Sequence, residues 1–118
     1  MLTDRPRHPE HGKALPQPDL SEIRVDQVLR ALGEPIRLGI VRSLARSELP
    51  MNCSSFGLTV SKSTSTHHFK VLRENGIIAQ YEQGTARYSE LRDTELEQRF
   101  PGLLAAVLAA TREDSWQD

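Results

Sequence analysis

The chain has 118 residues and a mass of 13.3 kDa, which suffices for one domain with tails but not for two full cores. Hydrophobic residues make up 37% and charged residues 26%, and no apolar run approaches the ~18 residues that cross a bilayer, so a membrane span is excluded. The first 18 residues carry charges and prolines where a signal peptide has an apolar stretch. Export is therefore not expected, and the predicted compartment is the cytoplasm.

Charge is distributed unevenly along the chain. The formal net charge of -1 argues at first against a nucleic-acid binder, since such domains are often strongly basic. Residues 49–73, however, contain Lys62, Lys70 and Arg73 and no acidic residue, whereas acidic residues crowd the C-terminal end. Acidic and basic groups are therefore expected on different elements.

The N-terminal part of the chain changes character near residue 19. Residues 1–18 are rich in proline and poor in apolar side chains, which predicts a flexible tail. A first helix is predicted from Ser21 until Gly33, with Asp19 or Ser21 as its N-cap. Its apolar residues recur at helical spacing: Val25, Val28, Leu29 and Leu32.

Two further helices and a short one are predicted in the middle of the chain. Pro35 suits the first position of a helix that runs to about Arg46. Residues 47–60 have a broken pattern that allows a short helix around 52–57. Ser61 is the candidate N-cap of the next helix, which continues until Gly76, a residue type favoured just past a helix end.

The C-terminal part is predicted to contain a β-hairpin and a broken helix. Residues 77–82 and 86–91 are short stretches rich in Ile and Tyr, joined by Gln83, Gly84 and Thr85. Helical spacing returns from Leu96 to Leu108 and is interrupted by Pro101, so a break is expected near Arg99. The predicted domain covers 19–112, followed by a tail over 113–118. The fold class is mainly α (α+β), with about five helices and one hairpin.

One face of the helix that follows Ser61 carries the candidate functional residues. At 100° per residue, Ser65, His68, Phe69 and Leu72 turn to one side. The other side contains hydrogen-bond donors and no acid: Ser63, Thr66, His67, Lys70 and Arg73. Such a face suits the phosphates and base edges of a DNA major groove, which admits one helix. The alternative without a functional role is a solvated polar face that has no binding partner.

The sequence resembles the ArsR/SmtB family of small winged helix-turn-helix repressors over about residues 25–92. The resemblance lies in ALGEPIRLGIVRSLARSEL, VSKSTSTHHFKVLRENGII and YEQGTARYSEL, and is strongest at Ser61, Ser63, Thr64, His67, His68, Leu72 and Arg73. It implies that the helix after Ser61 is a recognition helix, that the hairpin is a wing and that the first and last helices form a homodimer. Typical members bind an operator as dimers and leave it when a metal or another effector binds.

Dimerisation is also expected from the residues themselves. The first helix is amphipathic and the C-terminal stripe contains six large apolar residues, which is more than a small core covers. Two recognition helices related by a two-fold axis would meet major grooves about 34 Å apart and select an inverted repeat. The alternative is a monomer in which the C-terminal stripe packs on its own domain.

The chain departs from the family at its usual metal sites, so no metal and no cofactor is expected. A Glu-Leu-Cys-x-Cys segment of metal-sensing members corresponds to Glu48, Leu49, Pro50, Met51 and Asn52, and residues 93–118 contain no histidine for an interfacial zinc site. His67 and His68 point 100° apart and cannot converge on one ion.

Three further possibilities are open beside a DNA-binding repressor without a recognisable metal site. Cys53 lies near the start of a short helix, where a lowered pKa would make it redox-responsive. An apolar pocket between the first and last helices could hold a small-molecule effector, and a winged helix can also serve protein contacts. An enzyme is not expected, because neither a phosphate loop nor a nucleophile motif is present and no catalytic residue stands out.

The predicted partner is double-stranded DNA, with a role for each candidate residue. Ser63, Thr66, His67 and Lys70 are expected to approach base edges or nearby phosphates. The predicted contacts to the DNA backbone come from Lys62, Thr64 and Arg73, and Arg87 on the wing is expected to make a flanking contact.

Overall fold

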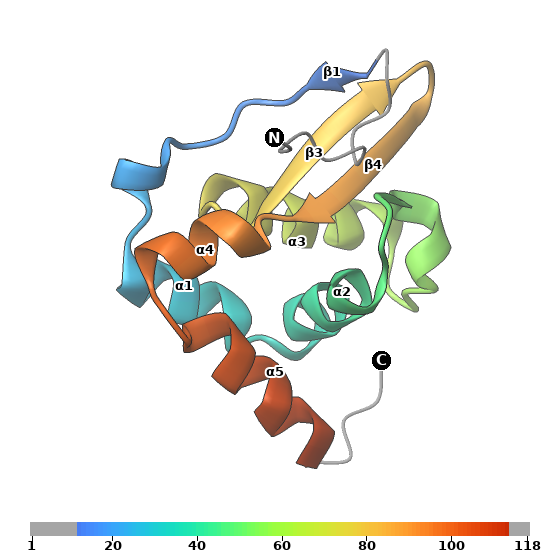
Figure 1. The fold of residues 1–118 in the computed structure, drawn as a ribbon. Coiled ribbons are helices and arrows are strands. Elements are labelled where there is room, and N and C mark those ends of the chain that lie inside the picture. The colour runs from blue at the N-terminus through green and yellow to red at the C-terminus, as the bar shows by residue number, and fades with distance from the viewer. Residues whose placement is uncertain (1–11, 114–118) are drawn as a thin grey trace.

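The computed structural model describes residues 12–113. Within this range the chain forms five α-helices, two single-turn 3-10 helices and four strands (Figure 1). In chain order they are β1 (Lys13–Ala14), η1 (Leu20–Glu22), α1 (Val25–Leu32), α2 (Pro35–Arg46), β2 (Met51–Asn52), η2 (Cys53–Phe56), α3 (Lys62–Glu74), β3 (Ile78–Gln83), β4 (Ala86–Leu91), α4 (Asp93–Arg99) and α5 (Leu103–Glu113). The helices lie on one side, and the β3–β4 hairpin projects from them. The predicted fold class, a winged helix-turn-helix, is confirmed.

The ends of the two central helices follow from local hydrogen bonds. Glu34 caps α2 by accepting a hydrogen bond from the backbone N–H of Arg37 at 2.9 Å. Pro35 occupies the first turn, where a backbone N–H would have no partner within the helix, so the missing donor of proline costs nothing. Ser61 caps α3 in the same way, with Thr64 N–H donating to its hydroxyl at 3.2 Å. Both predicted helix starts are confirmed.

The first helix is shorter than predicted. Residues 20–22 form the separate turn η1, in which Asp19 N–H donates to the Glu22 carboxylate at 3.0 Å, and α1 begins only at Val25. The backbone at Ile23 is extended, with φ -80° and ψ 127°. The break allows the Ile23 side chain, 1% exposed, to enter the core, which a continuous helix would prevent.

Gly76 ends α3 at a point of close approach to Ile23. Its φ is +79°, and a Cβ added there would lie 2.5 Å from Ile23 Cδ1. The backbone N–H of Ile77 donates to the Leu72 carbonyl at 3.0 Å, closing the helix end. The glycine predicted past the helix end is therefore required for both conformation and space.

The sheet is antiparallel in the order β1-β3-β4-β2. In the hairpin, Tyr81 pairs with Tyr88 and Glu82 with Arg87. The two-residue strands at the edges were not predicted. Strand β2 places Met51 opposite Ser89, and β1 places Lys13 opposite Glu82.

Residues 12–18 fall within the predicted flexible tail over residues 1–18 but are bonded to the domain in the structure, and we call them the strap. Besides the β1 pairing, Leu15 N–H donates to the Gln80 carbonyl at 2.9 Å and Arg92 Nη1 donates to the Pro18 carbonyl at 3.0 Å. These partners lie more than 60 residues away, so local composition could not indicate them. Figure 1 shows the strap along the edge of the hairpin. Residues 1–11 lie outside the described residues.

The C-terminal helical segment breaks where predicted. α4 ends at Arg99, and α5 begins at Leu103 after Gly102, whose φ is +83°. Glu113, the first residue of the tail predicted over 113–118, is the last residue of α5, and residues 114–118 lie outside the described part.

The core is shared by the helices and the base of the hairpin. Of the six large apolar residues in the C-terminal stripe, Leu96 and Leu104 are buried, and the others, Phe100, Leu103, Val107 and Leu108, are partly buried against the same core. The large apolar side chains that remain exposed are Val25 (43%) and Leu29 (49%) on α1, together with Leu49 (64%) between α2 and β2. Within the described residues, no helix is long and apolar enough to cross a membrane.

The pocket expected between the first and last helices is nearly filled. Side chains of α1 and α5, including Val28, Leu32 and Leu104, leave a space of only about 10 Å³ there. That is room for at most one water molecule, so the space between these side chains is smaller than a small-molecule effector.

Candidate nucleic-acid interface

The short helix, turn and long helix predicted for DNA binding are formed by η2, residues 57–61 and α3. Asn52 caps η2 by accepting from Ser54 N–H at 3.0 Å, and Gly57 leaves it with a left-handed φ of +69°. Phe56 in η2 packs edge-on against Phe69 in α3, with ring centroids 5.2 Å apart. This contact fixes the angle between the two helices.

The two faces of α3 are sorted as the helical spacing predicts. His68, Phe69 and Leu72 are buried. The exposed residues include six of the predicted site residues: Lys62, Ser63, Thr64, Thr66, His67 and Lys70. In the first turn, the Ser61 hydroxyl donates to Thr64 Oγ1 at 2.9 Å and lies 3.3 Å from Ser63 Oγ, so these hydroxyls also take part in the cap.

The exposed face is not free of acid over its whole length. Glu74 lies one turn beyond Lys70, and its carboxylate is 4.0 Å from the Lys70 ammonium. The prediction of an acid-free face therefore holds from Lys62 to Lys70 and fails in the last turn. An exposed pair of this kind contributes little, so Lys70 can exchange Glu74 for a phosphate at small cost.

Arg73 differs from the other predicted site residues because it bonds inside the molecule. Its Nε donates to the Pro16 carbonyl at 3.1 Å, and its Nη1 donates to Gln80 Oε1 at 2.5 Å. Burial is the main reason that the pKa of Arg73 lies below its ordinary value. The angle around the helix placed Arg73 with the exposed residues, but the strap and the hairpin cover this end of α3.

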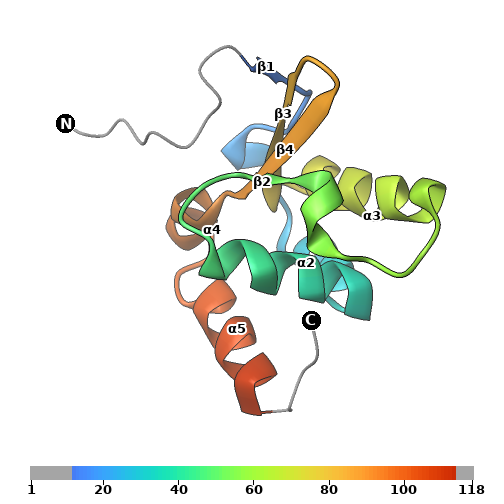
Figure 2. The same cartoon turned by 90° about the vertical axis from the view of Figure 1, so that its right-hand side faces the viewer.

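In Figure 2 the β3–β4 hairpin rises steeply from one end of α3, which runs across the view, and the hairpin turns at Gly84 and Thr85. Arg87 Nη2 is paired with the Glu82 carboxylate directly across the hairpin, at 2.5 Å, and both side chains remain partly exposed. Because such a pair is worth at most about 1 kcal/mol, Arg87 is available for a second anionic partner.

A concave space separates the hairpin from the start of α3 and has a volume of about 820 Å³. Its walls include Lys62 and Thr66 from α3 and Thr85 and Arg87 from the hairpin. The structure thus brings predicted helix and wing residues to the two sides of one cleft.

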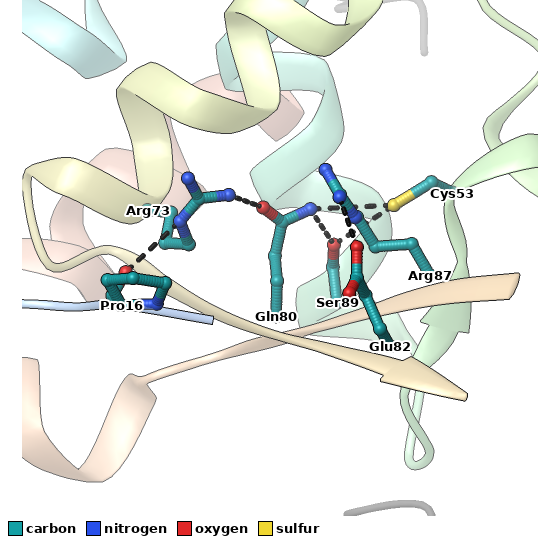
Figure 3. A network of polar contacts seen from close by, with 7 residues as sticks. All are labelled: Pro16, Cys53, Arg73, Gln80, Glu82, Arg87 and Ser89. Carbon is teal, nitrogen blue, oxygen red and sulfur yellow. Dashed lines mark hydrogen bonds and ion pairs between the residues drawn. The ribbon is translucent and has the colours of Figure 1, made fainter. Parts of the chain in front are cut away.

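Cys53 lies at the inner side of this cleft in a network of polar contacts (Figure 3). Its Sγ is 3.4 Å from Ser89 Oγ and 3.5 Å from Gln80 Nε2. Burial raises the pKa of the Cys53 thiol, despite these two hydrogen bonds. The lowered pKa that a redox-responsive cysteine requires is therefore not found. Sequence reasoning did not identify Gln80, which links the network. Its only signal in the sequence is an amide side chain near the apolar start of a predicted strand.

His68 takes a structural position on the buried side of α3. Its Nδ1 lies 3.2 Å from Arg37 Nη1 and 3.8 Å from Glu34 Oε1, so it joins α3 to the start of α2. The exposed His67 ring is 5.7 Å away, centroid to centroid. Among residues 12–113, no group of three or more His, Cys, Asp or Glu side chains is placed to hold a metal ion.

Comparison with known proteins identifies the family. The model described as "Bacterial regulatory protein, arsR family" matches residues 34–80, from the α2 cap through the helix-turn-helix into β3. The chain is 34% identical over 83 residues to the uncharacterized HTH-type transcriptional regulator YceK of Bacillus subtilis (strain 168), a match covering 69% of this chain and 83% of that protein. The chain belongs to the ArsR family.

The fold of this ArsR-family protein agrees with that of a solved relative. The crystal structure of an ArsR family transcriptional regulator matches with a TM-score of 0.58 at 20% identity, over 80% of this chain and 98% of that one. The resemblance found in the sequence is confirmed, and the chain is a DNA-binding helix-turn-helix transcriptional regulator.

Proposed function

We propose that this ArsR-family chain is a homodimeric repressor that binds an inverted-repeat operator in double-stranded DNA and lacks the family's usual metal sites. The observation that carries the proposal is the row of six exposed hydrogen-bond donors on α3, of which Lys62 and Thr66 also line the cleft shared with the wing. Thr66, His67, Ser63 and Lys70 are assigned to base edges or nearby phosphates, and Lys62 and Thr64 to the backbone.

Arg87 is assigned to a flanking contact from the wing, where only the exposed pair with Glu82 competes with a phosphate. We leave Arg73 out of the DNA contacts, because its guanidinium Nε and Nη1 are bonded to Pro16 and Gln80. A regulator of this kind acts where a bacterial chromosome lies, in the cytoplasm.

Dimerisation is supported by the uncovered apolar surface of α1. Val25 and Leu29 are one turn apart on the same face, so they extend the stripe whose inner half, Val28 and Leu32, packs in the core. We assign a second copy of the chain as the partner that covers Val25 and Leu29. In a two-fold interface, the same α1 surface of each copy packs against that of the other. Pairing across α1 and α5 would direct both α3 helices to successive major grooves, about 34 Å apart.

The proposal is tested by selecting bound duplexes from random DNA with the purified protein. We expect an inverted repeat bound by two chains. Affinity for the selected duplex should fall with rising salt, with a log-log slope of about -0.9 for each phosphate contacted. Selection that yields no common sequence, together with a flat salt response, would favour the alternative of a winged helix that binds a protein.

A further inference from the structure

The side chain of Gln80 connects α3, η2 and the two strands of the hairpin. It is buried, with 1% of the residue exposed, at the base of the hairpin. Its Oε1 accepts from Arg73 Nη1 of α3, and its Nε2 donates to Ser89 Oγ of β4 at 3.1 Å and to Cys53 Sγ of η2 at 3.5 Å. Figure 3 shows these groups in one continuous network between helix and hairpin.

Arg73 extends the network to the strap. While Nη1 bonds Gln80, Nε donates to the Pro16 carbonyl, so one guanidinium joins α3 to β3 and to the strap that lines the hairpin edge. Both contacts require the fork of an arginine, because a lysine ammonium cannot occupy both positions in this planar arrangement. Gln80 is similarly suited, since its amide accepts on one side and donates on the other.

We propose that Gln80 and Arg73 are positioning residues that clamp the wing to the recognition helix, so that α3 and Arg87 engage DNA as one rigid unit. The proposal rests on the proposed function and deepens it by assigning residues that touch no DNA. A surface fixed before binding loses less conformational freedom when it binds. Without the clamp, α3 still binds its groove, but the hairpin must be ordered separately, and the contribution of Arg87 shrinks.

The test is a double-mutant cycle for DNA affinity, measured on the duplex selected by the wild-type protein. The two changes are Arg87→Ala in the wing and Gln80→Met in the clamp. Gln80→Met keeps the length and apolar volume of the side chain and alters no charge, so it does not change the electrostatic attraction of the protein for DNA. Arg73→Lys, which keeps the charge but loses the fork, provides a second clamp variant should Gln80→Met reduce folding. Thermal unfolding of each variant is recorded in parallel.

In the wild-type background, Arg87→Ala is expected to weaken binding about fivefold, the value of a strong exposed ion pair. In a protein that already carries Gln80→Met or Arg73→Lys, Arg87→Ala should weaken DNA binding by less than about twofold. A fivefold effect of Arg87→Ala in both clamp backgrounds would overturn the proposal, even where the clamp variants unfold at lower temperature, since a merely structural role lowers stability without coupling to Arg87.

An Arg87→Ala variant that binds as tightly as the wild type also overturns the clamp, because no wing contact would then need positioning. That outcome is distinguishable from a failure of the proposed function, which is judged on α3 alone. Sequence-specific binding lost in Thr66→Ala and unchanged in Arg87→Ala would retain the repressor and reject the clamp.

Discussion

Arg37 Nη1 lies 3.2 Å from His68 Nδ1 and so ties the start of α2 to the buried side of the recognition helix. For the arginine to donate, His68 must be neutral at Nδ1. Arg37 is itself anchored, since its Nε donates to the Ala31 carbonyl at 2.8 Å. The exposed residues of α3 thus depend on a contact that exists in only one protonation state of His68.

The first prediction concerns stability below neutral pH. Burial is the main cause that lowers the pKa of His68; the nearby Glu34 carboxylate raises it, while Arg37 and His67 lower it. The unfolded chain takes up this proton below about pH 6.5 and the folded chain only at lower pH. The contribution of neutral His68 to the free energy of unfolding is therefore complete above about pH 6.5 and is lost as the pH falls through the pKa of His68 in the folded protein. We expect the melting temperature to drop by a few degrees between pH 7.5 and 5.5, and His68→Gln to show a flatter profile. An equal drop in both proteins would contradict this account.

The second prediction separates phosphate contacts from base contacts on α3. Lys70→Ala should weaken binding to operator and random DNA alike and reduce the salt slope by about 0.9. Thr66→Ala should cost about 1–3 kcal/mol of discrimination between them if the side chain reads a base. Binding isotherms on the two DNAs at several salt concentrations distinguish these effects. Equal losses on both DNAs for Thr66→Ala would exclude base reading.

The third prediction concerns the glycine at the end of α3. Gly76→Ala should destabilise the protein by about 2–4 kcal/mol, because an L-residue is strained at φ +79° and the new methyl group would meet Ile23 Cδ1 at 2.5 Å. Gly84→Ala is the matched control: its φ is +63°, but a Cβ there has no neighbour within 4 Å. It should cost only about 1–2 kcal/mol. Denaturant unfolding of both variants measures the difference, and equal losses would show that the contact with Ile23 is unimportant.

The fourth prediction addresses dimerisation through α1. Leu29→Glu places a charge on the uncovered apolar strip and should weaken the dimer by about tenfold or more. Leu49→Glu changes a leucine that is more exposed, at 64%, between α2 and β2, and should leave the dimer intact. Sedimentation equilibrium at several protein concentrations gives both dissociation constants. Dimers of equal strength would place the interface elsewhere.

The fifth prediction concerns oxidation. Because burial raises the pKa of Cys53, little thiolate is present near neutral pH and reaction with peroxide should be slow. We expect peroxide to leave DNA binding unchanged over minutes in the wild type, as in Cys53→Ser. Rapid release of DNA by the wild type, with Cys53→Ser unaffected, would restore the redox-responsive alternative.

Sequence patterns predicted the elements that are specified locally. Ser61 marks a helix start by accepting a hydrogen bond from Thr64 N–H, Pro35 marks one by its fixed φ, and Gly76 marks a helix end by its positive φ. The apolar spacing sorts α3 into its two faces. The strap, by contrast, is held by partners distant in sequence, such as Arg73 and Arg92, so its proline-rich composition suggested a tail. The same separation in sequence explains why Arg73 was predicted to contact DNA. Its position around the helix was predicted correctly, but the strap, from the N-terminal part of the chain, covers its side chain.

The direction of β1 determines which part of the molecule lies next to a domain attached ahead of the strap. Lys13 pairs with Glu82 and Ala14 with Tyr81, so Gly12, the first described residue, lies toward the hairpin turn at Gly84 and Thr85. The end of α5 lies at the opposite side of the molecule, as Figures 1 and 2 both show. A reporter domain placed directly before Gly12, in a chain shortened to that residue, would therefore adjoin the wing and is expected to obstruct the proposed DNA-binding surface.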